Sequence, residues 1–213
     1  MPSIEEARPW YPANDPVHGF DHVLRVYALA ERLALSEGAD LEIVHAAVLL
    51  HDANCGEQAP THSHRPDHHN AAAELARQVL KDQGWDQERI AAVEHCIRAH
   101  RFRQDSEAPQ TLEAKVLFDA DKLDAIGAIG VARAIAYAAC AGQPAYARPS
   151  TLFLQTGQKE ENEPHSAYHE YLFKLARLKE RLYTSTARCL AEQRHRWMAA
   201  FFERLAKEVN GEC

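Results

Sequence analysis

The sequence has few of the features that mark secreted, membrane or nucleic-acid-binding proteins. It holds five widely spaced cysteines among 213 residues, so neither a disulfide framework nor a zinc ribbon is predicted. It has no apolar run long enough to span a bilayer, and its acidic start, MPSIEEARPWYP, does not resemble a signal peptide. The net charge of −7 argues against a broad nucleic-acid or anionic-membrane surface. We therefore expect a cytoplasmic protein that binds neither membranes nor nucleic acid.

Strand signals are also missing. No alternating apolar run predicts a β-hairpin, no internal repeat is present, and the chain holds only 9 glycines and 10 prolines. Apolar residues instead recur at three- and four-residue steps, which is typical of amphipathic helices. Gly38 is expected to end one helix, and Asp40 and Asp86 to cap the next ones. The predicted helices cover about 21–37, 41–53, 67–83, 87–101, 112–125 and 128–141.

Two segments between and after these helices have a different composition. Residues 54–66 are polar and are predicted to form a loop, and residues 142–163 form a long irregular segment of the kind often used as a lid or substrate loop. Residues from about 164 to 209 predict one or two amphipathic helices, which could pack internally or pair two chains as a homodimer. The chain is thus predicted to be one all-α domain over 1–213, with a core over about 15–140.

Histidine is the one residue type that stands out, with 13 in the chain. By helical spacing, His22, His51 and Asp121 each fall on the apolar stripe of a different helix, and Asp52 directly follows His51. A single histidine on such a stripe is more often a hydrogen-bonded core residue than a ligand, and a His-Asp pair alone carries little information. Four such side chains together are different, because buried charges are costly unless they are paired or ligated. They predict a site for a divalent metal ion.

The ligand types narrow the choice of metal and of chemistry. Imidazole and carboxylate ligands suit one Mn²⁺, Mg²⁺, Fe²⁺, Ni²⁺ or Zn²⁺ ion with open coordination positions, and Mn²⁺ is favoured. A closed structural zinc site would prefer cysteine. An open position lowers the pKa of bound water and polarises a substrate oxygen, which suits the hydrolysis of phosphate esters.

Three stretches of the sequence are informative together: HGFDHVLRV at 18–26, AAVLLHD at 46–52 and, most specifically, DADKLDAIGAIGVAR at 119–133. They resemble one bacterial branch of the HD superfamily of metal-dependent phosphohydrolases. The resemblance covers about 15–140 and continues more weakly to the C-terminus. It implies an all-α, single-domain HD-type helical bundle with a central metal cleft. The implied metal ligands are His22, His51, Asp52 and Asp121. One departure is Gly19, where this branch often has aspartate.

Further residues are candidates for binding substrate. Asp52 could orient the attacking water as well as bind the metal, and Lys122 is a candidate for binding phosphate during catalysis. The other predicted substrate-binding residues are Arg25, His69, His100 and Arg101. The alternatives for single residues are a buried ion pair of Arg25 with Asp21 or Asp52, and a second metal ion held by His69, His95 and His100. His18 could orient an aspartate or bind phosphate, or it could be a loop or N-cap residue. His62 and His64 are expected to be exposed to solvent, and Asp124 could support a ligating histidine.

The predicted function is hydrolysis of a small phosphoester, with a nucleotide as the expected substrate. Cleavage of a nucleoside triphosphate to monophosphate and pyrophosphate and removal of phosphate from a nucleoside monophosphate both fit. The rival from another class is a non-catalytic module that senses nucleotides or metal. A carboxylate-bridged di-iron oxygenase is a further rival, and it would need about six ligands.

Overall fold

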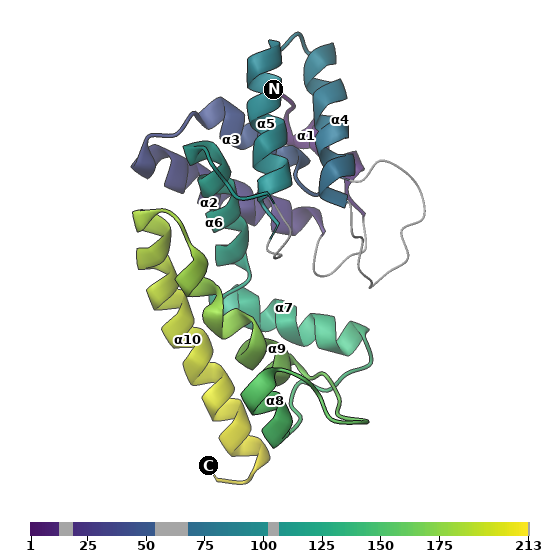
Figure 1. Cartoon of the computed structure of the whole chain (residues 1–213), viewed down its shortest axis with the longest axis vertical. Coiled ribbons are helices and arrows are strands. Elements are labelled where there is room, and N and C mark those ends of the chain that lie inside the picture. The colour runs from purple at the N-terminus through teal and green to yellow at the C-terminus, as the bar shows by residue number, and fades with distance from the viewer. Residues whose placement is uncertain (13–18, 54–67, 102–106, 213) are drawn as a thin grey trace. The chain divides into compact units, whose positions relative to one another are not determined.

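The computed structural model describes residues 1–12, 19–53, 68–101 and 107–212, and all regular structure in these ranges is helical (Figure 1). The predicted all-α class is therefore confirmed. The backbone groups into two compact units, one of Met1–Asp121 with Leu182–Ala187 and one of Lys122–Arg181 with Arg188–Cys213. We call them the first and second units. A single domain over the whole chain stays a prediction.

The first unit contains the helices that carry the histidines of interest. Its elements are α1 (Ile4–Ala7), η1 (Arg8–Trp10), α2 (Phe20–Glu37), α3 (Leu41–Leu50), α4 (His68–Asp82), α5 (Gln87–Ala99) and most of α6 (Leu112–Asp124). The predicted helix boundaries agree with those of the structure within about three residues, partly because the residues that cap and end the helices were identified correctly. Gly38 ends α2 in the left-handed region at φ 81°, and Asp40 and Asp86 accept hydrogen bonds from the first backbone N–H groups of α3 and α5.

Helix α3 forms the centre of the core of the first unit. All its residues from Val44 to Leu50 are buried, so that it is covered on every side, and it packs against α2 and α5. Such burial requires an apolar helix, which LEIVHAAVLL supplies. Helix α2 buries only one stripe, including Val23, Val26 and Leu33. The loop predicted over 54–66 lies outside the described residues.

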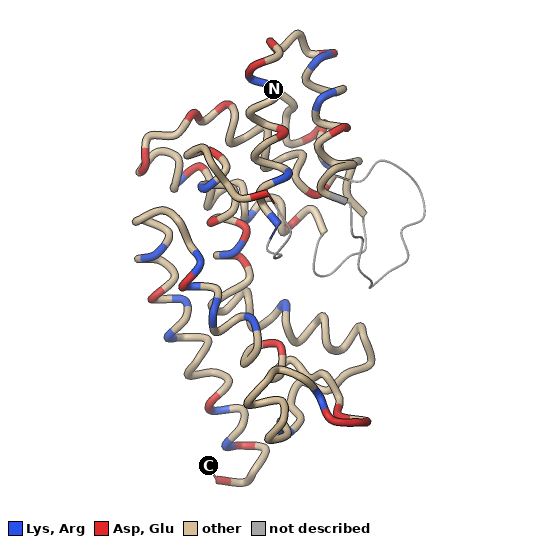
Figure 2. The backbone as a smooth tube through the Cα atoms, in the orientation of Figure 1, with Lys and Arg blue, Asp and Glu red and all other residues tan. Residues whose placement is uncertain are grey.

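The second unit contains α7 (Gly127–Cys140), α8 (Thr151–Thr156), α9 (Ala167–Phe173), η2 (Leu175–Arg181) and most of α10 (Ser185–Val209). The prediction of an irregular segment over 142–163 was wrong in one part, since α8 lies within it. Ser150 caps α8 and Gly157 ends it at φ 75°, and these two signals frame a helix of only six residues. The C-terminal region forms three helical segments rather than one or two. Acidic residues gather in the segment 160–163 of this unit, where the tube is coloured red (Figure 2).

Two glycines in the stretch AIGAIG permit close packing in the second unit. A Cβ atom on Gly127, which has φ 77°, would lie 3.0 Å from Cβ of Arg194. A Cβ atom on Gly130 would lie 2.3 Å from the carbonyl oxygen of Ala125, closer than real side chains come. The chain between α6 and the first turn of α7 can therefore follow this path because neither residue has a Cβ atom.

No single helix among the described residues is both long and apolar enough to cross a membrane. Helices α6 and α7 pass that test only as a pair bent by 66°.

Candidate metal centre

The His-Asp pair lies where the buried helix α3 ends. His51 is the C-cap residue of α3, with helical dihedral angles, and Asp52 follows in the turn. Since α3 is buried on all sides, His51 is carried into the core and is fully buried, whereas 19% of the Asp52 side chain is exposed. The end of the helix thus places an imidazole inside the unit and a carboxylate at its margin.

His22 meets this pair from the first turn of α2. It is 1% exposed, and its ring centroid lies 5.7 Å from that of His51. One ligand atom from each of His22, His51 and Asp52 can be chosen so that all lie within 4.8 Å of one another, a spacing that one metal ion can bridge. Asp121 of α6 reaches the same place, because its Oδ1 lies 3.4 Å from Nε2 of His22. The four predicted ligands are therefore neighbours, and their role as ligands stays a prediction.

The hydrogen bonding of His51 fixes which nitrogen faces Asp52. Nδ1 lies 2.7 Å from the carbonyl oxygen of Val48, which can only accept, so Nδ1 carries the hydrogen. Nε2 is buried, lies 3.5 Å from Oδ2 of Asp52, and makes no hydrogen bond with any described residue. Burial lowers the pKa of His51 to about 4, although the charge of Asp52 acts in the opposite direction. The neutral ring thus directs a lone pair at a carboxylate, an arrangement that a cation between them would stabilise.

His100 repeats this geometry from the end of α5. Its Nδ1 lies 2.5 Å from the carbonyl oxygen of Ile97, and its Nε2 lies 3.4 Å from Oδ1 of Asp52. The rings of His51 and His100 meet edge to face at 5.1 Å. His100 is 4% exposed, so it lies beside Asp52 within the unit rather than on its surface. This position is compatible with the predicted contact to substrate.

The other predicted substrate-binding residues differ in their surroundings. Nδ1 of His69 lies 3.2 Å from Nη1 of Arg101, so that these two side chains form a pair. Arg25 donates a 2.6 Å hydrogen bond to Asp21, which fits the ion-pair alternative for this arginine. The notion that this pair is buried was wrong, since 30% of Arg25 and 67% of Asp21 are exposed.

Side-chain partners bear on two further alternatives: His95 as a ligand of a second metal ion, and Asp124 as support for a ligating histidine. His95 bonds Glu107 through Nδ1 at 2.6 Å and accepts from the backbone N–H of Gln110 through Nε2, so both its nitrogens are engaged away from Asp52. Asp124 is 1% exposed and accepts a hydrogen bond from Arg133 of the second unit, to which both belong.

The predicted roles of four residues stay predictions. Lys122 directly follows Asp121 in α6 and is the first residue of the second unit, and its proposed contact with phosphate is inferred from this sequence position. His18, His62 and His64 lie outside the described residues.

Sequence reasoning missed two residues next to the predicted ligands. Tyr11 is 7% exposed and donates a 3.0 Å hydrogen bond to the carbonyl oxygen of Leu49. Burial raises the pKa of Tyr11 well above its ordinary value, the charge of Asp52 raises it further, and a hydrogen bond with the Asp52 backbone lowers it. The segment RPWYP has one tryptophan and one tyrosine among its five residues, and this aromatic content could have indicated that the segment packs against the core.

The other missed residue is Asp119, which is fully buried two residues before Asp121. Its carboxylate accepts from the backbone N–H groups of Tyr183 and Thr184 and from the Thr184 hydroxyl, at distances between 2.7 and 3.2 Å. It thereby holds the segment 182–187 against α6 within the first unit. The first aspartate of DADKLDAIG is therefore a structural anchor, which its sequence position could not show.

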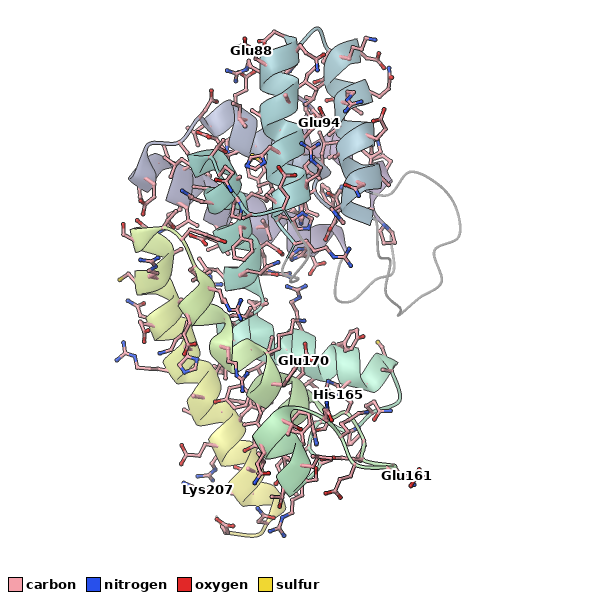
Figure 3. The ribbon with its side chains drawn as sticks, viewed as in Figure 1. Glu88, Glu94, Glu161, His165, Glu170 and Lys207 are labelled. Atoms are coloured by element: carbon pink, nitrogen blue, oxygen red, sulfur yellow. The ribbon has the colours of Figure 1, made fainter. Side chains whose placement is uncertain are left out.

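A second cluster of buried polar groups lies in the second unit. His169 is fully buried, its Nε2 lies 3.0 Å from Glu163 Oε1, and its Nδ1 lies 2.7 Å from Oγ of Ser166. Ser150 donates to the other oxygen of Glu163 at 2.7 Å. Beside this cluster, Nε2 of His165 lies 3.2 Å from Oε2 of Glu170 (Figure 3).

The family model for the HD domain matches residues 19–126. The chain belongs to the HD domain family. YpgQ of Bacillus subtilis (strain 168) is 33% identical over 218 residues, which cover 99% of this chain and 96% of YpgQ. The crystal structure of B. subtilis YpgQ in complex with ADP matches with a TM-score of 0.73 at 31% identity, covering 99% of this chain and all of that one. An HD-superfamily hydrolase from Bacillus thuringiensis matches with a TM-score of 0.64 at 29% identity, covering 90% and 86% of the two chains.

The HD match contains all four predicted metal ligands, whereas the cluster around His169 lies beyond it. Membership of the HD family indicates a hydrolase, and HD domains bind divalent metal ions, which agrees with the cluster of His22, His51 and Asp52.

Proposed function

We propose that this HD protein is a metal-dependent phosphohydrolase that acts on nucleotides. The observation that supports this most strongly is the buried, hydrogen-bond-free Nε2 of His51, directed at Asp52 in a group with His22. A hydrogen-bonded core histidine would have its second nitrogen paired, as His169 does. The pattern fits a cation held by His22, His51, Asp52 and Asp121.

A divalent ion at this place, with Mn²⁺ favoured, supplies charge neutralisation and Lewis-acid activation of the phosphoester. The side chains have separate tasks around it. The bond from Nδ1 of His51 to the Val48 carbonyl oxygen holds the ring in one tautomer and orientation. Asp52, partly exposed, orients the attacking water from the margin of the unit. The imidazole of His100 limits the positions that the Asp52 carboxylate can take.

Positive side chains offset the charge of the substrate phosphates in this proposal. Lys122 is proposed for this task from its place after Asp121, and Arg101 from its contact with His69. Arg25 could exchange its exposed partner Asp21 for phosphate, since exposed ion pairs contribute little free energy. A nucleotide substrate is supported by the complex of the related YpgQ with ADP. Nucleoside triphosphates and monophosphates are both candidate substrates.

Metal-stripped protein reloaded with Mn²⁺ should hydrolyse one or more nucleotides, and product analysis will separate pyrophosphate release from orthophosphate release. Asp52→Ala and Asp121→Ala should each abolish the activity. Asp82→Ala, which changes an exposed carboxylate at the end of α4, is the matched control. Equal activity in all three variants would place the activity elsewhere. Tight nucleotide binding without turnover would favour a sensing module, and two irons per chain would favour an oxygenase.

A further inference from the structure

Tyr11 contacts the start of α2 and the end of α3, the two helices that carry His22 and His51. Its ring packs against Phe20, with centroids 5.5 Å apart, and Phe20 is the first residue of α2, two positions before His22. Arg8 covers the Phe20 ring with its guanidinium group, 4.6 Å from the centroid. The short N-terminal segment is thus packed against the beginning of α2.

The hydroxyl group of Tyr11 meets the end of α3. It donates to the carbonyl oxygen of Leu49 at 3.0 Å. The last carbonyls of a helix lack partners within the helix. The residue that would continue the ladder, Ala53, donates to Leu50 instead, at 3.2 Å. The charge of Asp52 raises the pKa of the same hydroxyl, so the phenol also lies near the residue that follows His51. Tyr11 is therefore bonded to the backbone just before His51 and lies close to the His51-Asp52 turn.

We propose that Tyr11 is a positioning residue for the metal centre, which fixes the backbone of the His51-Asp52 turn and, through Phe20, the start of α2. Its role rests on the proposed function only in that an ion binds at His22, His51 and Asp52. Metal ligands must be held within a few tenths of an ångström of the required geometry, and groups that orient them contribute strongly to affinity. The turn is well suited to such support because α3 ends at Leu50 and the two ligands follow it.

A purely structural role for Tyr11 would give a different result from a positioning role. Loss of a buried hydrogen bond lowers the stability of the metal-free protein in either case. Only a positioning role also weakens metal binding in protein that is still folded. The affinity for the ion must therefore be measured well below the unfolding temperature, with no substrate present.

The test compares Tyr11→Phe with Tyr27→Phe, each of which removes one hydroxyl from the first unit. Tyr27 lies on α2 and stacks on His45 with centroids 4.3 Å apart, and it belongs to no part of the metal centre. Free Mn²⁺ is followed by electron paramagnetic resonance during titration of metal-free protein. The dissociation constant should rise about tenfold or more for Tyr11→Phe, the range seen when supporting hydrogen bonds around a metal are removed. It should stay within about twofold for Tyr27→Phe.

Replacement of Tyr11 by p-aminophenylalanine keeps a hydrogen-bond donor at the same place and should restore most of the affinity for Mn²⁺. This variant keeps the test decisive even if Tyr11→Phe does not fold. Equal dissociation constants for wild type and Tyr11→Phe would overturn the positioning role and leave the proposed function intact. A wild-type protein that binds no Mn²⁺ would overturn both. Phosphoester turnover is not needed for either decision.

Discussion

Two buried histidines, His51 in the first unit and His169 in the second, show opposite ways of placing an imidazole in a protein core. Both are fully buried. His169 has both nitrogens engaged, since Ser166 lies 2.7 Å from Nδ1 and Glu163 lies 3.0 Å from Nε2. His51 has only Nδ1 engaged, and its Nε2 faces Asp52 without a hydrogen bond.

Under the proposed function, this difference separates a structural cluster from a metal site. Around His169, each proton has an acceptor: Ser166 can donate to Nδ1, Nε2 can donate to Glu163, and Ser150 donates to the second oxygen of Glu163. Nothing has to be added, so the cluster acts to hold the segment between α8 and α9 in place. Around His51, a lone pair and a carboxylate face each other, and a cation would complete the arrangement. Burial of a histidine is common to both places, and only the partners reveal the role.

The largest expected effect is on catalysis. His51→Gln should lower the hydrolysis rate by about 10²- to 10³-fold or more, as removal of a charge-stabilising group does. His169→Gln should keep near wild-type activity per folded molecule, because the side chains that hydrogen-bond His169 all belong to the second unit. Initial rates with Mn²⁺ and a nucleotide substrate check this. Similar losses in both variants would contradict the distinction between the two clusters.

The next effect concerns stabilisation by metal. Mn²⁺ at a hundred times its dissociation constant should raise the free energy of unfolding by about 2.7 kcal/mol, because it binds only the folded state. The same gain is expected for His169→Gln, and none for His51→Gln. Thermal unfolding with chelator and with Mn²⁺ measures it. A gain that survives in His51→Gln would place the ion away from this residue.

A smaller effect is expected on the stability of the second unit. His169→Ala should lower the free energy of unfolding by about 1–3 kcal/mol, because Glu163 and Ser166 lose a buried partner. Ala200→Ser, a change on α10 that disturbs no such network, serves as the control. Urea unfolding measures both. An unchanged Mn²⁺ affinity in His169→Ala would confirm that the two clusters are independent.

The smallest effect is a dependence of stability on acidity. Burial raises the pKa of Glu163, but hydrogen bonds from His169, Ser150 and Glu160 outweigh it and lower the pKa to about 2 from an ordinary value of 4.5. A carboxyl with a lowered pKa stabilises the fold above pH 4.5, and this contribution is lost as the pH falls towards 2. Urea unfolding at several pH values should show a shallower decline for Glu163→Gln. An identical decline would exclude Glu163 as a source of acid sensitivity.

Much of the first unit could be predicted from the sequence, because helical periodicity assigns each residue to a face. Apolar spacing identified α2 and α3 and placed His22 and His51 on inward faces, where both are buried. The same reasoning brought Asp121 towards them, and the structure has it 3.4 Å from His22. These predictions succeeded because they depend on positions within single helices.

The expectations that lost support depended on partners from other elements or on short-range signals. A second metal ion held partly by His95 was only an alternative, and it loses support because Glu107 and Gln110, beyond the end of α5, engage both nitrogens of His95. The alternative of a buried ion pair for Arg25 was wrong about burial, since Asp21, its neighbour one turn away on the same helix, is exposed. Helix α8 was missed because six residues show too little periodicity.

The sequence by itself determined the helical class, the inward faces of the main helices and, through DADKLDAIGAIGVAR, the family. Only the tertiary structure decided which buried histidine is complete and which is not. The physical reason is that a periodic pattern fixes the direction of a side chain, whereas its hydrogen bonds depend on what other segments bring to it. His51 and His169 are alike in burial, and the partners brought by Val48, Glu163 and Ser166 make them different.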